Sequence, residues 1–389
     1  MGFSVGVARE DITPEVGGFL FGYNNHTRST SVNDNLTVTA LVFRSEAVSA
    51  VILSVTVCLI HETIAEEIAC KIEAATGIPA RNVIISCTHT HSAPRTTYFP
   101  RDLHFGDLDT DYCESILIPK YVEAAQKAAA DTYPVKVGIG TTQSLAGINR
   151  RQLLPDGTVI LGQNPWDTYD PTMTVITFNA NGKPLANIVH IGAHLTASGN
   201  NHEITRDWAG LMADRLEAES GAVTLFLNGA QGDIAPRMAN GDSVGNLQHA
   251  MEVGGLAGID AVRAYKSIRT FYNEEMQMTS GELSLPAKEG NDVWRAKQTL
   301  LRVGPIVFVP FPFEVSAEIG LRLRAYSPFA HTLLLACTNG SNSYLPAQSQ
   351  LCRGGYEVES FIKYREYRLP DDSDTRLINQ NLEFINHFI

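Results

Sequence analysis

Two histidines separated by one residue, His89 and His91, are the residues best suited to chemistry in this chain. They follow an apolar run at residues 82–87 that is typical of a buried strand. In an extended chain, residues i and i+2 project to the same side, so both imidazoles would face one space. Histidine is the commonest protein ligand for metals, and its near-neutral pKa lets a second histidine carry protons. The pair therefore predicts a metal and its reacting water.

A second pair of histidines, His190 and His194, lies at the end of a strand predicted at residues 186–194. Catalytic groups of α/β proteins gather where strands run into loops, which favours His194 as the functional residue. We interpret His190 as a core histidine or as a group that supports the ligands. Asp207 begins a predicted helix, where it is either the N-cap or a carboxylate that supports the site.

Three further polar clusters follow predicted strands. A glycine-rich turn at residues 228–237 can present backbone N–H groups to an oxyanion, or it is only a tight strand exit. Glu314 comes directly after the Pro-Phe-Pro-Phe segment that closes another strand. The third cluster runs from Asn339 to Pro346 and contains Tyr344. A second tyrosine, Tyr356, follows Tyr344 by twelve residues in the segment Gly-Gly-Tyr-Glu.

The elements that must position these residues alternate between strand-like and helix-like patterns, which is typical of α/β proteins with buried sheets. A TIM barrel also uses an H-x-H strand end, but the sequence lacks a regular eightfold strand–helix spacing. Pro119 is expected to kink or divide the second of the predicted helices. The helices are predicted at residues 61–75, 111–133, 207–220 and 314–324, the strands at 36–43, 48–60, 82–87, 135–141, 173–179, 186–194, 223–228, 303–311 and 333–337, and the two longest loops at 22–35 and 94–110.

Composition and charge narrow the class of partner. The 389 residues carry a formal charge of −12 and a pI of about 5.4, which argues against nucleic acid as a partner. No apolar stretch is long enough for a membrane span, and the N-terminus lacks a secretory signal pattern. The six cysteines are scattered without C-x-x-C spacing, as in reduced proteins. We expect a cytoplasmic protein with a small-molecule substrate and no integral membrane association, and a homo-oligomer is left open.

The clusters, taken in order, resemble the neutral ceramidase family, the zinc-dependent amidases that split the N-acyl bond of ceramide. The resemblance spans nearly the whole chain: the opening at residues 5–14, Gly22-Tyr23, the T-H-T-H-S-x-P motif, the strand end with His194, the N-G-x-x-G-D turn, the Pro-x-Glu element and the paired tyrosines. It implies an α/β fold of multilayered mixed sheets flanked by helices. It also implies that residues 1–389 form one zinc-hydrolase domain. The chain would then be a bacterial-type relative that consists of the catalytic domain alone.

The resemblance implies roles for individual residues. In the family, the residues that correspond to His89, His194, Glu314 and Tyr344 bind Zn²⁺, and a mixed N/O set with water is sensible for catalytic zinc. His91 and Tyr356 correspond to groups that polarise the substrate carbonyl or transfer protons. We assign substrate contacts to the glycine-rich turn and to two further segments, namely to Arg151, Asn228, Gly229, Asp233 and Asn339.

The sequence departs from the family in three places. The ceramidases have a serine, proposed as nucleophile, where this chain has Ala235, so that direct attack by zinc-bound water becomes the expected mechanism. Only 33 residues follow Tyr356, too few for the family's C-terminal β-domain, which makes a lipid substrate less expected. The sequence around Thr56 lacks a carboxylate found in many relatives, which argues against a second metal nearby.

These observations lead to one main hypothesis and two alternatives. The main hypothesis is a zinc-dependent hydrolase of amide or ester-type bonds in a small, linear substrate. The first alternative is a zinc enzyme that cleaves a sugar or polyol derivative by hydrolysis or elimination. The second is a metal-binding relative without catalytic activity.

Overall fold

The histidine pair follows an edge strand of the first of three main sheets. The computed structural model describes residues 2–99, 104 and 106–389. The sheet has the order β5-β4-β3-β1-β6, in which β5 is parallel to β4 and the other pairs are antiparallel. Its strands are β1 (Ser4–Asp11), β3 (Thr37–Arg44), β4 (Ser49–Val55), β5 (Val83–Cys87) and β6 (Tyr133–Pro134).

Both faces of this first sheet are buried, as the alternation of its side chains requires. In β3, Val38 and Val42 pack toward helices α1 (Glu62–Thr76) and α3 (Ile118–Ala130). Leu41 and Phe43 point the other way, into a core that the other two main sheets share. The first sheet therefore forms an inner layer, which explains its nearly continuous Val, Ile and Leu runs.

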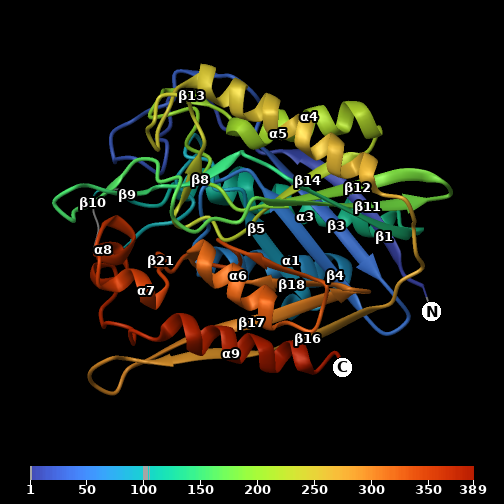
Figure 1. Cartoon of the computed structure of the whole chain (residues 1–389). Helices are drawn as coiled ribbons and strands as arrows, with labels where there is room; N and C mark the ends of the chain where they lie inside the picture. The colour runs from blue at the N-terminus through green and yellow to red at the C-terminus, as the bar shows by residue number, and fades with distance from the viewer. Residues whose placement is uncertain (1, 100–103, 105) are drawn as a thin grey trace.

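The second sheet lies between that shared core and a pair of helices. Its order is β14-β12-β11-β7, with β12 and β14 parallel. Trp208 and Met212 of α4 (Asp207–Ser220) and the alanine-rich face of α5 (Leu247–Ser267) pack on its outer face, as the upper part of Figure 1 shows. The strands are β7 (Lys136–Gln143), β11 (Thr172–Ala180), β12 (Lys183–Ile191) and β14 (Val223–Asn228).

The third sheet comes from the C-terminal part of the chain. Its order is β16-β17-β18-β20, with β18 and β20 parallel. Two helices lie along it in the lower part of Figure 1, α6 (Ala317–Tyr326) and α9 (Ser373–Asn386). The strands are β16 (Met276–Pro286), β17 (Val293–Val303), β18 (Ile306–Pro310) and β20 (His331–Leu335).

Short strand pairs hold together the loops between the main sheets. They are β2 (Ser31–Val32) with β13 (Glu203–Ile204), β8 (Gly147–Asn149) with β15 (Ile234–Pro236), β9 (Arg151–Leu153) with β10 (Val159–Leu161), and β19 (Glu314–Val315) with β21 (Tyr344–Leu345). Two more helices, α7 (Gln348–Leu351) and α8 (Tyr356–Lys363), follow β21.

The predicted α/β class of multilayered mixed sheets with flanking helices is confirmed, and most predicted elements are present. The break at Pro119 is also confirmed: a π-helical turn at Cys113–Leu117 separates α2 (Thr110–Tyr112) from α3 just before the proline, which has no N–H to donate. The helix predicted from Glu314 is wrong at its start, because Glu314 pairs with Tyr344 in β19–β21 and α6 begins at Ala317.

Other predicted boundaries need smaller corrections. The strand predicted at residues 48–60 ends at Val55, and the one at 186–194 ends at Ile191. The loop predicted at 94–110 includes residues 100–103 and 105, which lie outside the described residues. None of the helices in the described part of the chain combines the length and apolar composition that a bilayer span requires.

Candidate metal centre

The ends of parallel strands from all three sheets meet around the centre. Ser86 of β5 forms a bridge with Thr338, just after β20, and Thr90 forms one with Leu195, just after β12. The amide of Ala336 donates to the carbonyl of Asn228 at the end of β14, 3.0 Å away. The loops that begin at these points therefore share one region, in keeping with the tendency of α/β proteins to place sites at carboxyl ends of strands.

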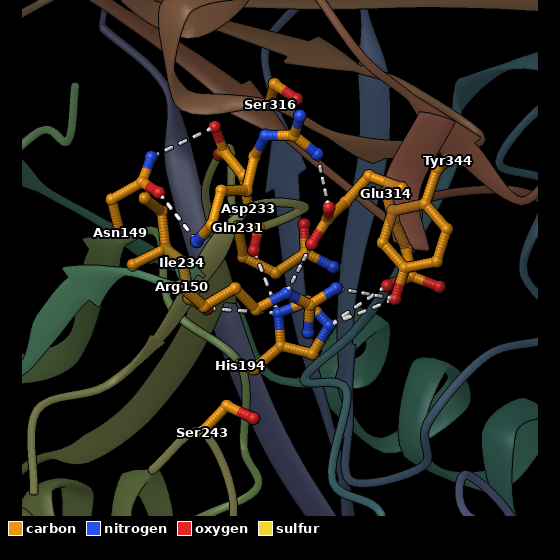
Figure 2. Close-up of polar contacts among 12 residues, drawn as sticks. Asn149, Arg150, His194, Gln231, Asp233, Ile234, Ser243, Glu314, Ser316 and Tyr344 are labelled. Carbon is orange, nitrogen blue, oxygen red and sulfur yellow. Dashed lines mark hydrogen bonds and ion pairs between the residues drawn. The ribbon is translucent and has the colours of Figure 1, made fainter. Parts of the chain in front are cut away.

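His89, His194 and Glu314 converge in this region. One carboxylate oxygen of Glu314, Oε2, lies 3.2 Å from Nε2 of His89 and 3.0 Å from Nε2 of His194. All three side chains are buried, and these donor atoms could together hold one ion. Figure 2 shows His194 and Glu314 facing each other with the phenol of Tyr344 beside them, and Tyr344 Oη lies 3.4 Å from His194 Nε2.

The far side of each imidazole is held by backbone carbonyls. Nδ1 of His89 lies 3.0 Å from the carbonyl of Cys58, and Nδ1 of His194 lies 2.8 Å from that of Gln231. Because a carbonyl can only accept, each Nδ1 must carry a proton, and Nε2 of each neutral ring keeps its lone pair. This arrangement is typical of histidines that bind a metal through Nε2.

The centre therefore brings together three atoms that carry lone pairs, namely Nε2 of His89, Nε2 of His194 and Oε2 of Glu314. Because these lone pairs repel one another, a proton or a metal ion is needed between them. Burial opposes protonation of His89, but Glu314 outweighs that cost and raises the pKa of His89 to about 10. Burial and Arg150 lower the pKa of His194 to about 4. The additional proton is therefore held by His89, beside the carboxylate of Glu314 and a neutral His194. A metal ion can replace this proton. Two nitrogen donors with a carboxylate and a phenol match the preferences of Zn²⁺.

Tyr344 is positioned by an arginine. Nη2 of Arg150 donates to the Tyr344 hydroxyl over 3.0 Å, and the guanidinium carbon lies 5.4 Å from the centre of the phenol ring. Arg150 is itself buried. Nothing local in the sequence indicates this contact, because Tyr344 lies 194 residues further along the chain.

The two histidines of the H-x-H pair meet, although not by the predicted geometry. β5 ends at Cys87, and His89 has a left-handed backbone with φ of 74°. Nε2 of His91 still lies 3.3 Å from Nε2 of His89. The Gly22-Tyr23 segment covers His91 from outside: a Cβ added to Gly22 would lie 2.4 Å from its Nδ1, and the Tyr23 ring meets the imidazole edge-on at 4.9 Å.

The charge state of His91 suits a proton acceptor. Burial and the neighbouring His89 and His194 hold the pKa of His91 well below its ordinary value. The ring is therefore neutral at pH 7.

A narrow cleft leads to the centre. Tyr356 stands at its mouth, 37% exposed, with its ring 5.4 Å from that of Tyr344. Aromatic side chains make up much of the wall. The ring centre of Phe99 lies 6.4 Å from that of Phe21 and 5.4 Å from that of Tyr364. The described lining consists of Phe21, Gly22, Cys58, Leu59, His89, His91, Phe99, Glu314, Ser343, Tyr344, Tyr356 and Tyr364.

Four of the residues predicted to bind substrate form hydrogen bonds that tie loops together. The amide nitrogen of Asn228 donates to the carbonyls of Thr88 and Ala193, and the N–H of Gly229 donates to Ile191. Asp233 accepts from the amide of Ala317 and from Gln350. Asn339 accepts from the amide of Ile85 in β5. These contacts use the polar groups of the four residues within the protein, and none of the four is among the described residues that line the cleft; their substrate role stays a prediction.

Arg151, also predicted to bind substrate, is bound within the protein, and its substrate role likewise stays a prediction. Its side chain is 2% exposed, and its guanidinium donates to Glu357 over 2.6 Å and to the carbonyl of Gly354 over 2.7 Å. Glu357 was not singled out in the sequence. Its only signal was its place directly after Tyr356.

Two thiols beside His89 were also missed. Sγ of Cys58 and of Cys337 lie 3.5 and 3.6 Å from Nδ1 of His89. Burial raises the pKa of both thiols, that of Cys337 to about 12, so they are neutral. They therefore pack against the imidazole and leave the carbonyl of Cys58 as the acceptor of its proton.

Asp207 and His190 support the site from a distance. Asp207 is the first residue of α4 and not its N-cap; its carboxylate accepts from the amides of Ser198 and Trp208, and Trp208 Nε1 donates to the carbonyl of His194. His190 is partly buried in β12, and its Nε2 donates to the carbonyl of Leu334 in β20 over 2.8 Å. It therefore links the second and third sheets.

His190 should make the protein less stable as the pH falls. Burial lowers its pKa in the folded protein below 6.5, the ordinary value that the unfolded chain retains. Below about pH 6.5 the unfolded chain then binds more protons, so the free energy of unfolding falls, by at most about 1.4 kcal/mol per pH unit for this group. Urea unfolding of the wild type and of His190→Gln from pH 8 to 5.5 measures this. The destabilisation caused by the substitution should shrink toward low pH; a constant difference would contradict the prediction.

The fold and the centre define the class: an α/β protein of stacked mixed sheets with a buried, histidine-rich candidate metal centre where its strands end. Residues 3–252 match the family model of the N-terminal region of neutral/alkaline non-lysosomal ceramidases. The chain therefore belongs to this hydrolase family, as the motifs had predicted. No curated protein matches its sequence.

Two solved structures share the fold over the whole chain. A neutral ceramidase from Pseudomonas aeruginosa is 17% identical, with a TM-score of 0.85, and the match covers 100% of this chain and 74% of that one. A structure described as ceramidase complexed with C2 is 16% identical, with a TM-score of 0.83, and the match covers 100% and 75% of the two chains. At these identities the likeness establishes the fold alone.

Ala235, the position of the expected serine, lies in β15. It is fully buried and pairs with Ile148 of β8. Alanine offers no nucleophile there, and a hydroxyl at this position would need a partner inside the protein.

Proposed function

We propose that this protein is a zinc-dependent hydrolase of linear amides in which His89, His194, Glu314 and Tyr344 hold one Zn²⁺. The observation that carries the proposal is the convergence of His89 Nε2, His194 Nε2 and Glu314 Oε2 at the inner end of a cleft. When bound, zinc supplies Lewis acidity, which polarises a carbonyl and lowers the pKa of water.

The side chains around the centre have separate tasks in this proposal. His91, neutral and 3.3 Å from His89, would accept the proton that the attacking water loses and pass it to the nitrogen of the leaving amine as the C–N bond breaks. Tyr356 donates a hydrogen bond from its phenol to the carbonyl oxygen as negative charge develops there. Arg150 holds the Tyr344 hydroxyl against the centre.

The lining of the cleft supports an amide with an apolar acyl group. Phe21, Leu59 and Phe99 form an apolar wall, and burial of such surface contributes about 25 cal/mol per Å². A sugar would need several hydrogen-bonding side chains to replace its water, and the described lining also offers His91, Ser343, Tyr356 and Tyr364. We rank amide hydrolysis above the sugar or polyol alternative because of the apolar wall and the family match.

We also propose a cytoplasmic location, a single domain and a small-molecule partner. All six cysteines are free, in agreement with the cytoplasmic location that we propose. The core shared by the three main sheets supports one domain over residues 1–389. A small molecule remains the proposed partner, and the oligomeric state stays open.

Metal analysis combined with a substrate panel tests the proposed function. We expect about one zinc per chain and turnover of N-acyl amides with apolar acyl groups. A chelator should abolish this turnover, and added Zn²⁺ should restore it, because the ion supplies several kcal/mol of transition-state stabilisation.

The same panel separates the alternatives. Cleavage of glycosides but not of amides would favour the sugar or polyol hypothesis. Stoichiometric zinc without turnover of any amide, ester or glycoside would favour a metal-binding relative without catalytic activity.

A further inference from the structure

A buried carboxylate stands between two buried arginines behind the tyrosines of the centre. Oε1 of Glu357 accepts from Nε of Arg150 over 2.8 Å, and Oε2 accepts from Nη1 of Arg151 over 2.6 Å. The side chain of Glu357 is 1% exposed. The arginines come from the β8–β9 region and Glu357 from α8, more than 200 residues later.

Glu357 is ionised despite its burial. Desolvation opposes ionisation, but Arg150 and Arg151 outweigh it and lower the pKa of Glu357. Two buried guanidinium groups that lost this carboxylate would leave positive charge uncompensated, which is strongly unfavourable in a protein interior. The three side chains therefore act as one unit, which we call the Arg–Glu–Arg clamp (Arg150, Glu357 and Arg151).

The clamp reaches the centre through both tyrosines. Arg150 donates through Nη2 to Tyr344 Oη over 3.0 Å. Arg151 donates through Nη2 to the carbonyl of Gly354, in the turn that leads into Tyr356. The chain approaches Arg151 closely there: Gly355 has φ of 91°, and a Cβ on it would lie 3.2 Å from Arg151 Nη1.

Arg150 also interacts electrostatically with a second carboxylate, that of Glu314. Glu314 contributes to raising the pKa of Arg150, together with Tyr344 and Glu357 and against desolvation. An arginine without Glu357 would be drawn toward Glu314, whose Oε2 is already shared by His89 and His194. Glu357 therefore gives Arg150 a partner that is not a candidate metal ligand.

We propose that Glu357 is a positioning residue for the reaction: it holds Arg150 on Tyr344 and away from Glu314, and through Arg151 it fixes the turn that carries Tyr356. This inference rests on the proposed function, since it assigns Tyr344 and Tyr356 to the reacting centre. Glu357 itself does not contact the substrate.

The test compares Glu357→Gln with a matched substitution on the same helix. Glu359→Gln removes an exposed carboxylate of α8 that pairs only with Lys363, at 2.8 Å, among the described contacts. With the amide substrate that the panel identifies, kcat of Glu357→Gln should fall about 10- to 100-fold while KM changes less than about threefold. Glu359→Gln should behave as the wild type in both constants.

A double variant separates positioning from loss of folding. Glu357→Gln leaves two buried positive charges, whereas Glu357→Gln with Arg151→Gln restores the wild-type net charge of the clamp. We expect the double variant to regain thermal stability but not kcat. If kcat returns together with the melting temperature, the role of Glu357 is only structural and the proposal fails.

A crystal structure of Glu357→Gln gives a readout that does not depend on activity. We expect Arg150 to leave Tyr344 and approach Glu314. An unchanged Arg150–Tyr344 hydrogen bond would overturn the proposal whatever the kinetics. The failure of the proposed function would look different: a wild-type protein without zinc and without amide turnover, in which the Arg150 displacement can still be measured.

Discussion

Replacing His89 with alanine should remove both the bound zinc and the activity. The imidazole supplies one of the converging donor atoms, and its loss leaves Glu314 and His194 without the third partner within 3.2 Å. We expect kcat/KM to fall by about 10³-fold or more, which corresponds to several kcal/mol of lost stabilisation. Zinc content after gel filtration, measured by elemental analysis, should fall from about one per chain to a small fraction of it.

His387→Ala is the matched control for this experiment. His387 is exposed at the C-terminal end of α9, and its imidazole contacts Thr279, outside the centre. This variant should keep zinc and activity. Full turnover and stoichiometric zinc in His89→Ala would exclude His89 as a ligand and with it the proposed centre.

Replacing Tyr356 with phenylalanine should separate catalysis from metal binding. The substitution keeps the ring at the mouth of the cleft and removes only the hydroxyl that we assign to the developing oxyanion. Loss of one such donor lowers kcat by about 10²- to 10³-fold. Zinc content and KM should stay near the wild-type values, because Tyr344 and not Tyr356 is the proposed ligand.

Tyr326→Phe controls for the loss of a phenol. Tyr326 is 64% exposed at the end of α6, and its substitution should leave kcat unchanged. If Tyr356→Phe instead lost its zinc, the two tyrosines would have exchanged roles. A kcat equal to the wild type would exclude the phenol of Tyr356 from the reaction.

The sequence was sufficient to predict the fold class, and its resemblance to the ceramidases supplied the candidate ligands. Each candidate ligand comes after a strongly apolar strand, and the order of the short motifs identified the family that the match over residues 3–252 confirms. The start of the helix expected at Glu314 was wrong, because the two residues of β19 pair with β21 across some 30 residues of chain. Pairing at that separation leaves no local pattern.

The parts of the site that the sequence did not indicate are ion pairs formed inside the protein between residues far apart in the chain, and these leave no spacing pattern. The sequence analysis assigned Arg151 to the substrate and gave Arg150 no role, because nothing local in the sequence reveals that Glu357 meets both arginines inside the protein. Asn228 and Asp233 read as substrate ligands, because a polar residue after a strand serves equally well to bind a ligand or to tie a loop. Only the three-dimensional contacts distinguish the two uses.

The order in which the chain supplies its donors has a consequence for biosynthesis. In the proposed centre both imidazoles lie within the first 200 residues, whereas Glu314 follows His194 by 120 residues and Tyr344 comes later still. A nascent chain that has emerged only as far as residue 252 can offer an ion nitrogen donors but neither oxygen donor. Firm retention of the ion would therefore require that the third sheet has been translated and has docked.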